Sequence, residues 1–121
     1  MSQRTTIPDD AIAAYDRVIA SADGAVRKGA TMPYTAINGN MSSFLSPTGV
    51  LALRLPAADR AAFIRQYDAL PHEAHGRPMA EYLSVPDALL ADTETLAPWF
   101  ASSWRYVASL KPKSTTKDSS R

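Results

Sequence analysis

Two histidines and one glutamate lie close together in the run His72-Glu73-Ala74-His75. Imidazoles at positions i and i+3 of a helix could share a metal ion. Pro71 precedes this run and Gly76-Arg77-Pro78 follows it, so the local sequence disfavours a regular helix. The chain has no third histidine and no cysteine to complete a zinc site. We therefore predict that His72 and His75 lie in an exposed loop and that no residue binds a metal.

Motifs of the common catalytic sites are absent from the sequence. No serine stands in a Gly-x-Ser-x-Gly turn, and the five glycines are scattered singly rather than gathered in a phosphate-binding loop. The carboxylates show no spacing typical of a catalytic pair, and we expect Glu81 to form a surface ion pair with Arg77. We therefore predict no catalytic residue and no cofactor, and the sequence favours a non-enzymatic function.

Aromatic residues gather near the end of the chain, where Trp99, Phe100, Trp104 and Tyr106 follow one another closely. This is more aromatic surface than one buried helix stripe requires. In one interpretation the rings all pack beneath the helix or lie along its flanks. In the other, Trp99, Trp104 and Tyr106 form an interaction surface for a protein partner or a second copy of the chain, because aromatic residues often anchor such contacts.

The first half of the chain predicts one helix followed by three strands. Apolar residues at helical spacing indicate a helix over residues 8–22, with Thr6 as its cap. Strands are expected over 31–37, 41–45 and 50–55. Asn38-Gly39 predicts a two-residue turn between the first two strands, because both of its residues tolerate a positive φ. Together the strands form an antiparallel meander. The first strand is expected to lie at an edge or to begin after Pro33, because Pro33 cannot donate to a ladder.

The second half of the chain predicts three further helices and one or two further strands. We expect a helix over 56–68, an irregular stretch over 69–80 that contains a short strand, and a strand over 81–85. A turn of helix over 87–91 and a long helix over 96–110 complete the chain. The fold class is α+β, an antiparallel sheet of three meander strands plus one or two more packed against helices, in the order α-β-β-β-α-(β)-β-α.

Length and composition are those of one small globular domain. The chain has 121 residues, 45% of them hydrophobic and 21% charged, and no cysteine that could form a disulfide. No apolar run reaches the length of a membrane span, and acids at Asp9 and Asp10 stand where a signal peptide would be apolar. We therefore expect a cytoplasmic protein without membrane contact, and the abundance of Arg and Ala suggests a bacterial source.

Positive charge is concentrated at the end of the chain. The last eleven residues, Lys111 to Arg121, carry four of the 13 basic residues and one of the 12 acidic ones, which leaves 9 basic and 11 acidic residues, or about −2, in residues 1–110. We expect one α+β domain over 1–110 and a disordered basic tail over 111–121. Nucleic-acid binding is disfavoured except through this tail, because no folded stretch is rich in Lys and Arg.

Several short motifs are spread over about residues 10 to 113. They are Gly29-Ala30-Thr31-Met32-Pro33-Tyr34, Asn38-Gly39-Asn40-Met41, Leu51-Ala52-Leu53-Arg54-Leu55-Pro56, Gly76-Arg77-Pro78-Met79-Ala80-Glu81-Tyr82-Leu83-Ser84-Val85-Pro86, Leu96-Ala97-Pro98-Trp99-Phe100 and Ser109-Leu110-Lys111-Pro112-Lys113. In this order the motifs resemble the N-terminal domain of TfoX/Sxy-type proteins. The resemblance implies an α+β fold and an association with the regulation of bacterial competence genes, and it transfers no catalytic residue. Pro33-Tyr34 departs from the family's usual glycine-rich run, and the chain stops before the helical C-terminal domain of the full-length regulators.

The sequence thus favours a non-catalytic protein-interaction or regulatory module, with an unidentified protein partner or a homodimer. One alternative is a small-molecule-binding protein or an unrecognised enzyme, whose pocket would be lined by Tyr34, His72, His75 and Arg77. Another alternative is weak, sequence-independent binding of nucleic acid through Lys111–Arg121.

Overall fold

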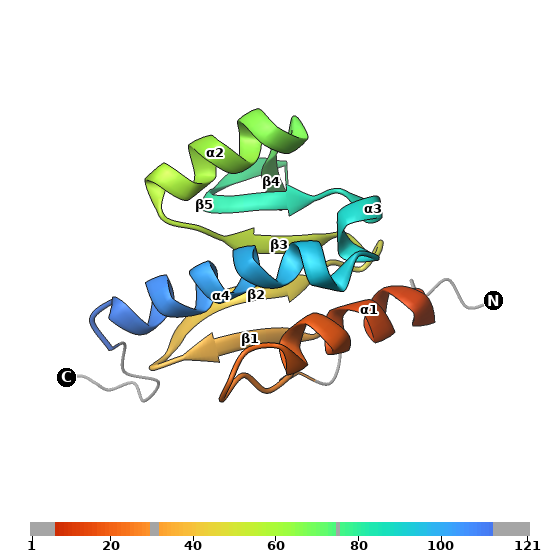
Figure 1. Ribbon diagram of the computed structural model, residues 1–121, viewed down its shortest axis with the longest axis horizontal. Coiled ribbons are helices and arrows are strands. Elements are labelled where there is room, and N and C mark those ends of the chain that lie inside the picture. Colours follow the sequence, from red (N-terminus) through yellow and green to blue (C-terminus); the bar gives the residue numbers. More distant parts are fainter. Residues whose placement is uncertain (1–6, 30–31, 75, 113–121) are drawn as a thin grey trace.

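The computed structural model describes residues 7–29, 32–74 and 76–112, which form four helices and five strands (Figure 1). The observed order confirms the predicted α+β fold and its sequence of elements. In chain order the elements are α1 (Asp9–Ala20), β1 (Tyr34–Ile37), β2 (Asn40–Leu45), β3 (Leu51–Arg54), α2 (Ala57–Tyr67), β4 (Pro71–Ala74), β5 (Arg77–Val85), α3 (Asp87–Leu90) and α4 (Thr93–Ser109).

The five strands form one antiparallel sheet in the order β1-β2-β3-β5-β4. The meander β1-β2-β3 is present as predicted, and β1 lies at an edge. Asn38 and Gly39 have φ angles of 55° and 82°, the left-handed values that a tight turn between two antiparallel strands requires. The chain then leaves the sheet through α2 and returns in β4 and β5, with β5 inserted beside β3.

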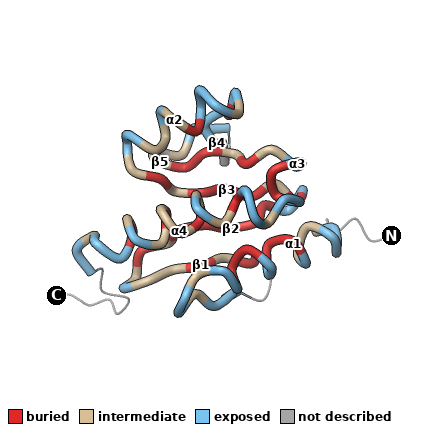
Figure 2. The backbone as a smooth tube through the Cα atoms, viewed as in Figure 1, coloured by how far each residue is buried: buried red, intermediate tan, exposed pale blue. Residues whose placement is uncertain are grey.

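The helices cover one face of this sheet. Figure 1 shows α4 crossing it, and α4 contacts β1, β2 and β3. Leu51, Leu53 and Leu55 point toward this layer and are fully buried, as their alternation predicts. Figure 2 shows buried residues along the strands and on α1 and α3. The molecule is therefore a two-layer sandwich with its main core between the helices and the sheet.

α4 begins three residues earlier than the sequence suggested. The carboxylate of Asp92 accepts hydrogen bonds from the Thr95 backbone N–H (3.3 Å) and the Thr95 hydroxyl (2.7 Å), which caps the helix. Pro98 consequently lies inside the helix and has no N–H to donate to the carbonyl of residue 94. The buried side of α4 follows the predicted spacing and consists of Leu96, Phe100, Ser103 and Val107.

The prediction that His72 lies in an exposed loop is wrong. β4 spans Pro71–Ala74 and pairs with β5, which confirms the short strand expected within residues 69–80. His72 is only 6% exposed. The prolines and the glycine around His72 predicted an irregular loop. The segment is a strand instead, because it pairs with the long strand β5, and this pairing cannot be seen in the local sequence.

A chain of buried hydroxyl groups links α1 to the first two strands. The Tyr15 hydroxyl lies 2.7 Å from the Ser43 Oγ, and the Thr35 Oγ1 lies 2.5 Å from the same atom. Thr35 also contacts the Ser42 Oγ at 2.6 Å, beside the bulge in the pairing of β1 and β2. Burial raises the pKa of Tyr15 to about 12. These bonds satisfy polar groups that would otherwise be costly to bury in the core.

The two ends of the chain are described only in part. Thr6, the predicted cap of the first helix, and residues 113–121 of the predicted basic tail lie outside the described residues. Asn40 donates through Nδ2 to the Lys111 carbonyl at 3.1 Å, so the first residue of the predicted tail contacts β2. None of the helices described here is long and apolar enough to cross a membrane.

Candidate functional site

The face of the sheet opposite the helices carries a second apolar cluster. Phe44 and Ala52 are buried there together with Tyr82, and Tyr34 and Met41 pack against them. These residues alternate along their strands with the residues of the main core. Both faces of the sheet are therefore apolar, although the helices cover only one of them.

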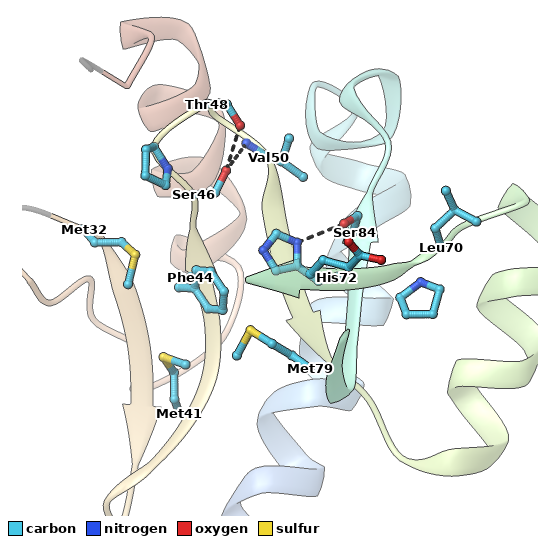
Figure 3. A pocket seen from close by; sticks show the side chains of 13 residues that line it. Met32, Met41, Phe44, Ser46, Thr48, Val50, Leu70, His72, Met79 and Ser84 are labelled. Carbon is cyan, nitrogen blue, oxygen red and sulfur yellow. Dashed lines mark hydrogen bonds between the residues drawn. The ribbon is translucent and has the colours of Figure 1, made fainter. Parts of the chain in front are cut away.

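This second face is hollowed into a pocket of about 1020 Å³, which we call the hollow (Figure 3). Its wall is formed by residues of β2, β4 and β5, by the turn between β2 and β3, and by single residues that precede β1 and β4. The lining residues are Met32, Met41, Phe44, Ser46, Pro47, Thr48, Val50, Leu70, Pro71, His72, Glu73, Met79 and Ser84.

Methionine is concentrated in the hollow. Three of the chain's four methionines, Met32, Met41 and Met79, line it. Figure 3 shows their thioethers around Phe44. Methionine side chains are flexible and polarizable, so they adapt to apolar molecules of different shape. At the rim, Met32 and Leu70 are 39% and 70% exposed.

Most polar groups in the hollow already have partners. The Ser46 Oγ lies 3.1 Å from the Thr48 Oγ1 and accepts a hydrogen bond from the Val50 backbone N–H at 3.1 Å. These bonds close the turn between β2 and β3, so the two hydroxyls serve that turn.

His72 is the exception, because only one of its two ring nitrogens is used. Its Nδ1 lies 2.9 Å from the Ser84 Oγ, and its ring meets the Phe44 ring edge to face at 5.1 Å between centroids. Within the described part of the chain, Nε2 has no hydrogen-bond partner. Figure 3 shows that nitrogen on the side of the ring turned away from Ser84, toward Phe44. Burial lowers the pKa of His72, which favours the neutral imidazole.

The charge around the hollow is negative. Among the thirteen described residues that line it, Glu73 is the one acid, and there is no Lys or Arg. Glu73 itself is exposed. The described lining of the hollow therefore offers no Lys or Arg that would hold a carboxylate or a phosphate.

A separate ionic cluster lies where β3 ends and β5 bends. The Arg54 Nε donates to the Glu81 Oε1 at 2.7 Å, and the Tyr106 hydroxyl donates to the Oε2 at 2.8 Å. Arg60 lies 3.9 Å from the same Oε2. Burial alone would raise the pKa of Glu81, but the hydrogen bonds from Arg54 and Tyr106 and the positive charges of Arg54 and Arg60 together lower that pKa.

The prediction of an ion pair between Glu81 and Arg77 is therefore wrong. Four residues along an extended strand span roughly 13 Å. Glu81 also has a φ of 74°, which redirects the strand at this point. The carboxylate is consequently held by Arg54 and Arg60, and this cluster ties β3, β5 and α4 together.

The predicted aromatic surface is half-buried. Trp99 lies against α2, with its ring centroid 5.0 Å from that of Phe63 and 6.1 Å from that of Tyr67. Tyr106 is engaged by Glu81, and Trp104 is also half-buried. Trp99 and Tyr106 thus contact other parts of the same chain.

The predicted pocket residues are only partly brought together. His72 lines the hollow, and Tyr34 packs against the cluster at its floor. Arg77 is exposed and does not line the hollow, and His75 lies outside the described residues. Sequence reasoning missed Met41, Phe44 and Met79, although the apolar residues at alternate positions facing away from the core were a usable signal.

Neither a metal-binding cluster nor a similar protein identifies the ligand of the hollow. Within residues 7–29, 32–74 and 76–112, no group of three or more His, Cys, Asp or Glu side chains could hold a metal ion. The chain matches no protein-family model, no curated protein and no solved structure.

Proposed function

We propose that this domain is a non-catalytic binding module that takes a mainly apolar small molecule in the hollow. The observation that carries the proposal is the pocket itself, about 1020 Å³ in volume, on the face of the sheet opposite the helices. Ligand sites in proteins are typically concave, apolar and about 300–1,000 Å³ in volume, with a few polar groups that fix orientation. The hollow has each of these properties.

The apolar lining supports an affinity in the micromolar range. A ligand that removes about 400 Å² of apolar surface from water gains about 10 kcal/mol at about 25 cal/mol per Å². Part of this gain is offset by the lost freedom of the ligand and of the methionine side chains. If association costs about 4 kcal/mol, about 6 kcal/mol remains, which corresponds to a Kd of tens of micromolar.

Catalysis by Ser84 and His72 is not supported. The Ser84 backbone N–H already donates to the Leu70 carbonyl at 2.9 Å, so it is not free to stabilise an oxyanion. No described carboxylate hydrogen-bonds to His72, so its ring lacks the partner that orients the base in hydrolytic triads.

The other expectations from the sequence stay predictions. The protein-interaction surface on α4 gains no support from rings that are half-buried within the chain. The relation to TfoX/Sxy-type N-terminal domains and a regulatory role remain proposals, and in such a role occupancy of the hollow would be the signal. Binding of nucleic acid by Lys111–Arg121 and homodimer formation remain untested predictions.

The test is binding of N-phenyl-1-naphthylamine, an uncharged fluorophore that brightens in apolar surroundings. We expect saturable binding of one molecule per chain with a micromolar Kd. Met79→Lys places a charged chain in the hollow and is expected to weaken binding at least about ten-fold, since a desolvated ammonium is costly. The control is Ile64→Lys, the same change at a residue of α2 that is 39% exposed and does not line the hollow.

Circular dichroism and thermal unfolding would show that both variants are folded. Absence of saturable fluorescence with the wild-type protein would overturn the proposal. An equal loss of binding in the two folded variants would place the probe outside the hollow and would overturn it too.

A further inference from the structure

We propose that the ligand of the hollow is an uncharged amphiphile, an apolar chain or ring that carries one hydroxyl, carbonyl or amide group, and that the Nε2 atom of His72 binds this group. The inference rests on the proposed function and adds the chemical class of the ligand and the atom that selects it.

Among the described side-chain groups of the hollow that are buried, one hydrogen-bonding atom is left as a polar anchor, whereas the Glu73 carboxylate is exposed. Ser46 and Thr48 are paired with each other, and Ser46 also accepts from the Val50 N–H. The Ser84 hydroxyl is paired with the His72 Nδ1. Of the side-chain groups described here, Nε2 is thus a hydrogen-bonding atom inside the hollow that still lacks a partner.

An apolar ligand that displaces water from the hollow would cover this nitrogen and leave it without a hydrogen-bond partner. His72 is 6% exposed, and Phe44 covers part of its ring. An unpaired buried polar group costs about 1–3 kcal/mol, and a neutral hydrogen bond contributes about 0.5–1.5 kcal/mol net. A ligand with one matching polar group is therefore favoured over a pure hydrocarbon of the same size.

Charge excludes the two ionic classes of amphiphile. No Lys or Arg lines the described hollow, and Glu73 at its margin repels anions. The neutral imidazole adds no positive charge. Glu73 is the one described acid that a cationic head group could pair with, and because Glu73 is exposed, this ion pair would add little to the binding free energy. An uncharged polar group can instead enter fully and reach His72.

Competition against bound N-phenyl-1-naphthylamine at pH 8 tests the inference with three ligands of equal chain length. We expect 1-decanol to displace the probe, and decanoate and decyltrimethylammonium to bind at least about ten-fold more weakly, because a desolvated charge is costly. His72→Phe keeps an aromatic ring against Phe44 but removes the anchor. It is expected to weaken 1-decanol binding about 2- to 12-fold, the loss of one hydrogen bond.

Tyr67→Phe is the matched control, since it removes a hydroxyl from α2 outside the hollow and is expected to leave 1-decanol binding unchanged. Equal or tighter binding of either ion, failure of 1-decanol to displace a bound probe, or full 1-decanol affinity in His72→Phe would overturn the inference while the binding function stands. Absence of probe binding would instead remove the proposed function itself.

Discussion

Leu53→Ala is expected to lower the free energy of unfolding by about 2–5 kcal/mol. Leu53 is fully buried in the centre of β3, beneath the helix layer. Its removal deletes apolar contacts and leaves a cavity that a rigid strand between two neighbours cannot close. Urea unfolding followed by far-UV circular dichroism measures this loss directly.

The matched change on the opposite face is Met41→Ala, at a half-buried residue that lines the hollow. We expect less than about half the loss seen for Leu53, because a partly exposed side chain has less apolar surface to lose. Comparing the stability losses of Leu53→Ala and Met41→Ala therefore distinguishes the face of the sheet that stabilises the fold from the face that is available for binding. Equal losses would show that both faces are packed alike and would contradict this division.

Phe63→Ala is expected to lower the free energy of unfolding by about 3–5 kcal/mol and to loosen the packing of α2 against α4. Phe63 is the one fully buried residue of this eleven-residue helix. Its ring lies 4.9 Å from Tyr67 and 5.0 Å from Trp99, measured between centroids. Phe63 is therefore the main apolar anchor of α2, beside the polar contact of Arg60 with Glu81.

Trp99 reports on this anchor if Trp104 is replaced by phenylalanine in every protein compared. In Phe63→Ala the Trp99 emission is expected to shift to longer wavelength, because the ring loses its cover from α2. The control is Ile64→Ala, at the neighbouring 39% exposed position, which should change stability by less than about 1 kcal/mol. An unchanged emission in folded Phe63→Ala would contradict the assigned role.

Local patterns predicted most of the fold. Asn38-Gly39 determines a turn through the φ angles of two adjacent residues, and the alternation of Leu51, Leu53 and Leu55 indicates the buried face of one strand. The stripe from Leu96 to Val107 likewise follows from helical geometry. Each of these features is encoded within a few residues, so sequence reasoning can reach it.

The alternation of apolar residues could have indicated a second apolar face, but the hollow on that face could not be predicted in this way. Met41 and Met79 are far apart in the sequence, and they meet the same pocket only because β5 inserts beside β3. His72 was noticed for its chemistry, but its burial depends on the pairing of β4 with β5. Such long-range pairing leaves no local signal. In addition, the Pro and Gly residues around His72 are typical of irregular structure, so they indicated a loop rather than a strand.

The apolar rim of the hollow fits a binding role better than a structural one. Leu70 is 70% exposed at the rim, and Met32 is 39% exposed. Neither side chain is fully covered by the described fold, and exposed apolar patches in folded proteins commonly mark interaction sites. A bound apolar molecule would cover them.

The most direct test of binding in the hollow is methyl NMR with ¹³C-methyl methionine and isoleucine. On addition of N-phenyl-1-naphthylamine we predict shifts of the methyl signals of Met32, Met41 and Met79, which line the hollow. Ile19, which belongs to the main core, and Ile64 on α2 should stay unchanged. Shifts centred on these isoleucines, or no shift at the three methionines at saturating probe, would contradict the assignment of the hollow as the binding site.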